Sequence, residues 1–185
     1  MSRLLIILLI VVALGSTAGA RDTNWATKIE QPGLPNLHRV TDRIYRCAQP
    51  TAAGMQAAEK LGIKTVISLR GFHSDKDEVE STKLKTERIY FHTWHAEEED
   101  VVRFLKIVTN TNARPILVHC QHGADRTGTM IAIYRMAVQG WKKDDAIKEM
   151  TDGGFGYHTM WKNLIEYLNK LDIEALRKKA GLKAP

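Results

Sequence analysis

Apolar positions along the chain follow two spacings, and these predict alternating strands and helices. Short runs rich in branched or apolar residues predict strands at 37–40, 43–47, 64–69, 88–94 and 115–118. Apolar residues three or four positions apart predict helices over 51–61, 98–109, 126–139, 143–150 and 158–171, with a short tail helix after them and a weak, charged helix between Ser74 and about Thr86. This alternation indicates an α/β fold, with a mainly parallel central sheet covered by helices on both faces.

The predicted strands differ in their expected places in the sheet. The first two flank Thr41-Asp42 and predict a hairpin. The run Pro115–Val118 is short and wholly apolar, as in a central parallel strand that is covered on both faces, where proline is tolerated as the first residue. We therefore expect this strand in the middle of the sheet, with a helix soon after it.

The first 20 residues have the pattern of a secretory signal. Arg3 precedes an unbroken apolar run from Leu4 to Leu14, and small residues then lead to Ala20. The sequence predicts a signal peptide over 1–20, cleaved after Ala20, or else an uncleaved anchor that would tie the protein to a membrane. Pro32, Gly33 and Pro35 predict an irregular lead-in over 21–36, which leaves one domain over 37–185.

The formal net charge of +6 falls to +5 once Arg3 is removed with the signal, and the basic residues are spread along the chain. Their one cluster, Arg177-Lys178-Lys179, is interpreted as a solvated helix end rather than a nucleic-acid surface. A modestly positive protein of this kind attracts anionic substrates. The charge pattern predicts no nucleic-acid partner and no particular oligomeric state.

One of the two cysteines stands where ligands bind in such folds. Cys120 follows the predicted central strand, at the carboxyl end of which open α/β sheets bind their ligands. The next five residues, Gln121, His122, Gly123, Ala124 and Asp125, lead to Arg126 and the start of a helix. Backbone N–H groups of such a loop form an anion cradle, and Gly123 lets it fold tightly.

The same surroundings would activate the thiol. Loop N–H groups and a helix N-terminus stabilise a thiolate, and they lower the pKa of such cysteines to roughly 3.5–7.5. The Arg126 guanidinium matches two phosphate oxygens, Thr127 places a hydroxyl beside the sulfur, and His119 can orient the loop. These groups suit the transfer of a phosphoryl group to sulfur and then to water.

The segment His119-Cys120-Gln121-His122-Gly123-Ala124-Asp125-Arg126-Thr127 resembles the H-C-x5-R-T signature of cysteine-dependent protein tyrosine phosphatases, dual-specificity branch. Ile44–Pro50 resembles the Y-R-S-x-Q-P strand of small members of that branch, with Cys47 in place of serine. Tyr134-Arg135, Gln139-Gly140-Trp141 and Gly153–Gly156 resemble bacterial periplasmic members, so the likeness covers about 37–170.

The resemblance implies a phosphatase domain of dual-specificity type over 37–185, acting on phosphorylated proteins in the periplasm. Cys120 would form the phosphocysteine intermediate, Arg126 would bind the phosphate, and Thr127 would assist hydrolysis of the intermediate. The family's general acid is an aspartate on an upstream loop, which here would be the acidic loop 96–100. Glu98 fits the spacing best, with Glu97 and Asp100 as alternatives, although all three acids also complement a helix N-terminus. The resemblance implies no metal and no organic cofactor.

Three alternative functions stay open. An inositol phosphate phosphatase would use the same chemistry, but Gln121, Ala124 and Asp125 lack the basic character that highly charged rings require. A rhodanese-like sulfurtransferase would not need Thr127 or the acidic loop. A non-enzymatic phosphate-binding module would bind phosphopeptides without turnover.

The second cysteine raises a question of redox chemistry. Thiols in an oxidising compartment tend to pair, and Cys47 ends a strand that we expect beside the central one. Cys47 is therefore interpreted either as a resolving partner for Cys120 or as a small buried residue in place of serine.

Overall fold

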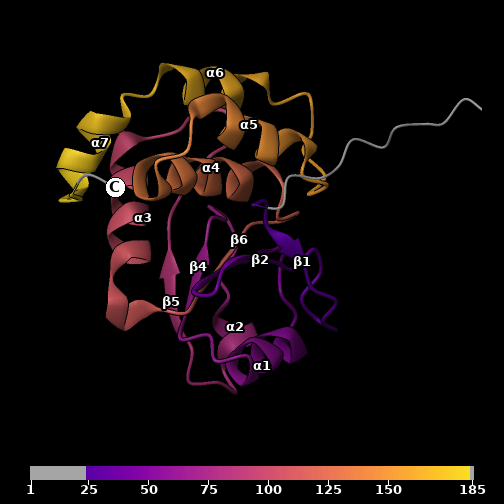
Figure 1. Ribbon diagram of the computed structural model, residues 1–185. Helices are drawn as coiled ribbons and strands as arrows, with labels where there is room; N and C mark the ends of the chain where they lie inside the picture. Colours follow the sequence, from indigo (N-terminus) through magenta and orange to yellow (C-terminus); the bar gives the residue numbers. More distant parts are fainter. Residues whose placement is uncertain (1–23, 184–185) are drawn as a thin grey trace, which may run out of the picture.

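The computed structural model describes residues 24–183 (Figure 1), so the predicted signal peptide lies outside the described residues. Its strands are β1 (Thr27–Lys28), β2 (His38–Thr41), β3 (Ile44–Cys47), β4 (Thr65–Ser68), β5 (Lys85–Arg88) and β6 (Ile116–His119). Its helices are α1 (Ala52–Lys60), α2 (Lys76–Val79), α3 (Glu98–Thr109), α4 (Asp125–Gln139), α5 (Lys143–Asp152), α6 (Lys162–Lys170) and α7 (Ile173–Ala180), with a 3-10 turn at Thr111–Ala113. Within this part of the chain, no helix is long and apolar enough to span a membrane.

The sheet confirms the predicted α/β architecture and the central place of β6. Its order is β1-β2-β3-β6-β4-β5, with β6 parallel to both neighbours, while β2 forms antiparallel pairs with β1 and β3. His119 is level with Cys47 on one side and with Ser68 on the other. The carboxyl ends of β3, β6 and β4 therefore meet at one edge of the sheet, directly before Cys120.

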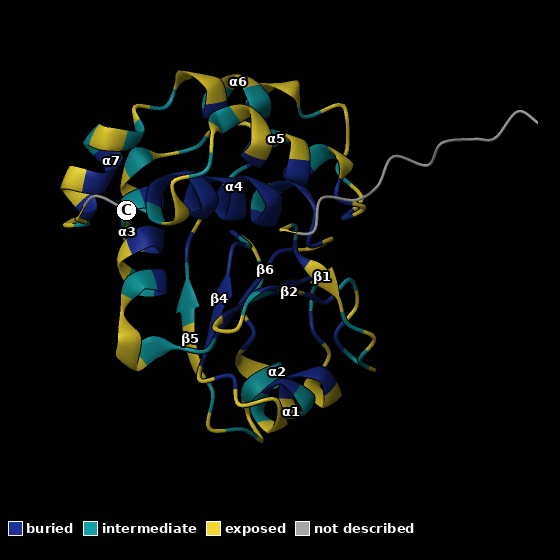
Figure 2. Cartoon of the chain, viewed as in Figure 1, coloured by how far each residue is buried: buried dark blue, intermediate teal, exposed yellow. Residues whose placement is uncertain are grey.

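Helices cover both faces of the sheet (Figure 1), as predicted. On one face, α1 contributes Met55 and Ala58 to a core that also contains Cys47 and Leu117. On the other face, α3 to α7 pack over a larger core, with α4 between the sheet and the outer helices. Figure 2 shows α4 as almost wholly buried. Its N-terminus consequently points from the protein interior to the loop that follows β6.

Three elements differ from the sequence prediction. Helix α2 spans only Lys76–Val79, because its polar sequence buries no residue. The last sheet strand is β5, not 88–94, because the N–H of Phe91 donates to the carbonyl oxygen of Ile89 in a tight turn away from the sheet. Helix α6 begins at Lys162 rather than at 158, because the backbone N–H of His158 donates to Asp125 instead.

Two smaller predictions were also wrong. The described part of the predicted lead-in, 24–36, is not wholly irregular, since β1 extends the sheet at Thr27–Lys28. The basic cluster in α7 is not wholly solvated, because Arg177 is 3% exposed and its guanidinium donates to the carbonyl oxygen of Lys183. Lys178 and Lys179 remain exposed, as expected.

Candidate active site

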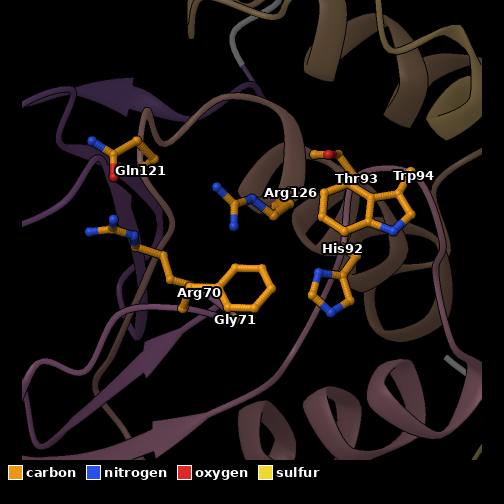
Figure 3. A pocket seen from close by; sticks show the side chains of 8 residues that line it. Arg70, Gly71, His92, Thr93, Trp94, Gln121 and Arg126 are labelled. Atoms are coloured by element: carbon orange, nitrogen blue, oxygen red, sulfur yellow. The ribbon is translucent and has the colours of Figure 1, made fainter.

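A cavity of about 260 Å³ opens at the edge where β4 and β6 end. The segment after β4 contributes Arg70, Gly71 and Phe72, the segment before α3 contributes His92, Thr93 and Trp94, and the residues after β6 contribute Gln121 and Arg126. Figure 3 shows the Arg126 guanidinium pointing to the side where Arg70 and Gln121 lie, with His92 and Trp94 on the other side. The structure thus brings the predicted Arg126 into a cavity whose other cation is Arg70, a residue that the sequence analysis did not single out.

Cys120 directly precedes the cavity residue Gln121 and is itself buried, with 2% of the residue exposed. The 120–126 loop turns sharply at Gly123, which has a φ of 69°. A Cβ atom at this glycine would lie 2.5 Å from the carbonyl carbon of Cys47, so the loop packs directly on the end of β3. The prediction that Gly123 permits a tight loop is confirmed, and the reason includes this close approach as well as the backbone angle.

Two side chains from outside the loop hold its carbonyl groups outward. Arg46 Nη2 donates to the carbonyl oxygen of Gly123 over 2.7 Å, and Asn36 Nδ2 donates to that of His122 over 3.0 Å. In a trans peptide the next N–H points opposite to the carbonyl. The N–H groups of Gly123 and Ala124 therefore point away from these two side chains, as an anion cradle requires.

Arg46 is itself fully enclosed. Its guanidinium lies 3.8 Å from the ring centroid of Phe155, and the residue is 1% exposed. Burial lowers the pKa of Arg46 to about 10, although the charges of Glu149 and Cys120 act in the opposite direction. The guanidinium therefore keeps its proton at neutral pH and adds a buried positive charge behind the loop.

Arg126 and Thr127 occupy the first turn of α4, above the loop. Arg126 Nη1 donates to the carbonyl oxygen of Leu69 over 3.1 Å, and this bond fixes the guanidinium against the end of β4. Thr127 is fully buried, and its hydroxyl has no hydrogen-bond partner among the described residues. A buried hydroxyl without a hydrogen bond lowers the stability of the folded state. Its presence here therefore favours a hydrogen-bond partner that is supplied during the reaction.

A series of hydrogen bonds connects His119, the residue before the thiol, to Arg70 in the cavity. His119 Nε2 donates to Asp75 over 2.8 Å, Gln49 Nε2 donates to the other oxygen of Asp75 over 2.9 Å, and Arg70 Nη1 donates to Gln49 Oε1 over 2.8 Å. Burial would raise the pKa of Asp75, but bonding to His119 and Gln49 outweighs it and lowers that pKa to about 2. The structure therefore supports the predicted role of His119 in orienting the loop, and it supplies Asp75 as the anchor.

The three candidate acids, Glu97 just before α3 and Glu98 and Asp100 in its first turn, do not line the cavity. Glu98, which the sequence favours as general acid, pairs with Lys179 of α7. Glu97 pairs with His95 over 2.8 Å, in the turn that also carries the cavity residue His92. Asp100 lies in the first turn of α3, where burial and the charge of Glu97 raise its pKa. The role of Glu98 stays a prediction, and the geometry favours Glu97 over it.

Among residues 24–183, two clusters of side chains have the composition of a metal site. One consists of His122, Asp125 and His158, and the other of His73, Asp75 and Glu78. Asp125 accepts hydrogen bonds from both the backbone N–H and Nδ1 of His158, over 2.9 and 2.8 Å. Asp75 is held by His119 and Gln49 in the same way. Hydrogen bonds within the protein therefore account for both clusters, and Asp125 is turned to His158 rather than lining the cavity.

The two thiols are free and belong to different cores. Strand β3 does run parallel to β6, as the redox interpretation required. However, Cys47 packs with Met55 and Leu117 on the α1 face, whereas Cys120 packs in the core on the α4 face. Burial and the charge of Cys120 also raise the pKa of Cys47, which keeps this thiol protonated. These observations favour the interpretation of Cys47 as a small buried residue.

Comparisons with known proteins agree with this site. A family model described as "DSP-PTPase phosphatase fused to NAD+ Kinase" matches residues 29–163. Dual specificity protein phosphatase TpbA of Pseudomonas aeruginosa is 34% identical over 165 residues, which are 87% of this chain and 73% of TpbA. A crystal structure of P. aeruginosa TpbA in complex with pTyr matches with a TM-score of 0.78 and 30% identity, over 87% of this chain and 98% of that one. An inositol diphosphatase of Arabidopsis thaliana is 24% identical over 123 residues, or 62% of this chain and 60% of the relative.

Proposed function

This chain belongs to the DSP-PTPase phosphatase family and is a phosphatase, and we propose that it hydrolyses phosphotyrosine in proteins through a phosphocysteine on Cys120. One observation carries the proposal. Cys120 lies at the carboxyl end of the central strand, at the start of a loop whose carbonyls are held outward by Arg46 and Asn36 and whose Gln121 and Arg126 line the cavity. The pTyr complex of the TpbA structure supports the choice of phosphotyrosine.

The first chemical step transfers the phosphoryl group to sulfur. Loop N–H groups and the Arg126 guanidinium bind the three outer phosphate oxygens and neutralise the charge that these oxygens carry in the transition state. The Cys120 thiolate attacks phosphorus, the S–P bond forms, and the bond from phosphorus to the tyrosine oxygen breaks. An acid of the 96–100 loop donates a proton to the departing oxygen, which otherwise leaves as a phenolate.

The second step releases inorganic phosphate. A water molecule attacks phosphorus, the same acid residue now takes a proton from the water, and the S–P bond breaks to restore the thiolate. In this proposal Thr127 donates a hydrogen bond to the sulfur as it leaves, which is supported by its buried hydroxyl having no other partner among the described residues. Arg126 and the loop N–H groups hold the phosphoryl group throughout, so both steps use one geometry.

Arg70 favours a second candidate, an inositol phosphate phosphatase. The 120–126 loop lacks the extra basic residues that highly charged rings require, but Arg70 supplies a second cation in the same cavity. The likeness to an inositol diphosphatase of A. thaliana points in the same direction. Against it, the cavity carries Phe72 and Trp94, which offer apolar surface to an aryl ring and little to a polyphosphate.

Phosphate release from matched substrates separates the candidates. The protein without residues 1–20 is assayed with a phosphotyrosine peptide, the corresponding phosphoserine peptide, an inositol phosphate panel and thiosulfate. We expect the highest kcat/KM on the phosphotyrosine peptide. A higher value on an inositol phosphate would replace this proposal with the second candidate, and binding without release would indicate a phosphate-binding module.

We further propose that the protein is exported to the periplasm and that cleavage follows Ala20. The proposal is supported by the basic start, the apolar run and the small residues of the first 20 positions. Cell fractionation with N-terminal sequencing of the protein tests it. The expected result is a periplasmic protein that begins at Arg21, and a membrane-bound protein that begins at Met1 would support the uncleaved anchor.

A further inference from the structure

We propose that Arg70 forms a second anion site, which binds a carboxylate next to the phosphotyrosine and makes the enzyme select acidic peptide sequences. This inference rests on the proposed function and deepens it, because it assigns a substrate class to the same cavity. Arg70 follows β4 and lines the cavity together with Arg126. Figure 3 shows its side chain on the side of the cavity to which the Arg126 guanidinium points.

The two guanidinium groups lack a directly bound carboxylate. Within residues 24–183, neither Arg70 nor Arg126 forms an ion pair, and the carboxylate of Asp75 reaches Arg70 only through the amide of Gln49. Burial, followed by the nearby charge of Arg126, lowers the pKa of Arg70. Two cations that share a cavity in this way repel each other, so the bound state is stabilised by two anionic groups rather than one.

Arg70 is also held in place before any substrate binds. Its Nη1 donates to Gln49, which in turn bonds to Asp75, and its carbonyl oxygen accepts a 3.0 Å hydrogen bond from Arg88 Nε. A guanidinium has five N–H donors, and the structure gives one bond to this group among the described residues. The others are left for a ligand, in the fork geometry that binds a carboxylate through both oxygens.

The rest of the cavity indicates which molecule carries this second anion. Phe72 is 90% exposed and Trp94 is 64% exposed, and the ring of His92 contacts both of their rings. Exposed aromatic rings beside a phosphate site favour a ligand with its own apolar surface, such as the tyrosine ring and the adjoining peptide. An inositol polyphosphate carries anions on all sides and would leave these rings without a partner. The site therefore fits a phosphotyrosine peptide with a neighbouring Asp or Glu.

The test compares peptides that differ by one charge. A phosphotyrosine peptide with Glu at each position flanking the phosphotyrosine in turn is compared with the same peptide carrying Gln. We expect the wild-type protein to favour the better Glu peptide about tenfold in kcat/KM, through a lower KM, since charge-assisted hydrogen bonds have this order of effect in partly buried sites. The preference should weaken as salt is raised.

Variants assign the preference to Arg70. In Arg70→Gln, the ratio between Glu and Gln peptides should fall to about one, and in Arg70→Lys part of it should remain, because a point charge replaces the fork. Arg39→Gln is the matched control, since it removes an exposed arginine of β2 that pairs with Asp42. This control should keep the wild-type ratio. Thermal unfolding of each variant checks that the fold is retained. If Arg70→Gln does not fold, the ratio measured for Arg70→Lys is compared with the wild-type ratio instead.

The possible results separate this inference from the proposed function. Equal turnover of Glu and Gln peptides by the wild-type protein overturns the second anion site and leaves the phosphotyrosine phosphatase standing. A preference that persists in both Arg70 variants overturns it as well, as does an effect of Arg70 on inositol phosphates alone. If no phosphotyrosine peptide is hydrolysed, the proposed function itself fails.

Discussion

Arg46 donates a 2.7 Å hydrogen bond to the carbonyl oxygen of Gly123, although 77 positions separate the two residues along the chain. This bond turns the peptide after Gly123 so that its N–H faces the phosphate side of the loop. The glycine in turn lies so close to the backbone of Cys47 that it leaves no room for a Cβ atom. The end of β3 therefore shapes the loop twice, once through the side chain of Arg46 and once through the backbone of Cys47.

This close packing predicts a large effect of Gly123→Ala. A methyl group would meet the Cys47 carbonyl carbon at 2.5 Å, in addition to the strain of a φ of 69°. We expect kcat/KM to fall by about 10², because small displacements of catalytic groups have effects of this size. Phosphate release and thermal unfolding are the measurements.

Gly62→Ala is the matched control for that substitution. Gly62 has a φ of 84°, but a Cβ atom there would meet nothing within 4 Å. The control should therefore lose about 1–2 kcal/mol of unfolding free energy from backbone strain alone, with activity retained. If Gly123→Ala behaves like this control in both measurements, the close packing of the loop on β3 is not important for activity.

The folded state lowers the pKa of Asp75 from 3.8 to about 2, which predicts a pH dependence of stability. A lowered pKa contributes stability that is fully present above about pH 4 and is lost as the pH falls to about 2. The contribution is on the order of 2 kcal/mol, since each pKa unit corresponds to about 1.4 kcal/mol.

Asp75→Asn isolates this effect. Urea unfolding at several pH values between 2 and 7 should show that the difference in stability between wild type and variant shrinks below about pH 4. Asp77→Asn, two residues further along in the exposed helix α2, is the control and should show a much smaller change. A difference that stays constant over this pH range would mean that Asp75 does not bind His119 as a carboxylate.

The general acid is predicted to be Glu97. Its carboxylate pairs with the side chain of His95, whose backbone forms a β-bridge with that of the cavity residue His92. Glu98 instead forms an ion pair with Lys179. Glu97→Gln should lower kcat by about 10²–10⁴ on phosphotyrosine and much less on an aryl phosphate with an acidic leaving group.

Glu98→Gln and Asp100→Asn are the comparison variants for this assignment. Both should keep kcat within a few-fold of wild type on both substrates. If Glu98→Gln instead shows the leaving-group-dependent loss, the choice made from sequence spacing is right. If none of the three does, His92 and His95 are the next residues to replace.

Cys47 is predicted to take no part in redox regulation. It lies on the opposite face of the sheet from Cys120, and its raised pKa makes it a poor nucleophile. Peroxide inactivation and recovery with a thiol reductant should therefore follow the same course in wild type and Cys47→Ser. Slower recovery of Cys47→Ser, together with a Cys47–Cys120 disulfide detected by mass spectrometry, would restore the resolving-partner interpretation.

The sequence predicted the parts of the site that are contiguous in the chain. Cys120, Gly123 and Arg126 were found because one loop between a strand and a helix carries the thiol, the turn and the guanidinium. The central place of β6 was also predictable, since its first three residues are apolar. All four of its residues, His119 included, are buried. The exposed edge strand β5 was misplaced, because its polar sequence gives a weaker signal than Ile89 and Phe91, which are buried outside the sheet.

The parts of the site that come from distant segments were missed. The missed residues are Asn36 in the segment before β2, Arg70 just after β4, and Asp75 at the start of the short polar helix α2. No local sequence pattern distinguishes them from surface residues. Arg46 lies in the segment Ile44–Pro50, and the resemblance of that segment to the family strand assigns it no role. Their functions depend on which strands are neighbours in the sheet, and the order β3-β6-β4 is a tertiary property that periodicity does not give.

The most direct test of the account is to trap the intermediate. Wild-type protein is mixed with a phosphotyrosine peptide, quenched within one turnover and digested for mass spectrometry, in parallel with Cys120→Ser. The account predicts one phosphoryl group on Cys120 in the wild-type protein, and no phosphate release by the variant, which should still bind the peptide because Arg126 and the loop remain. Substantial turnover by Cys120→Ser, or a phosphoryl group on any other residue, would contradict it.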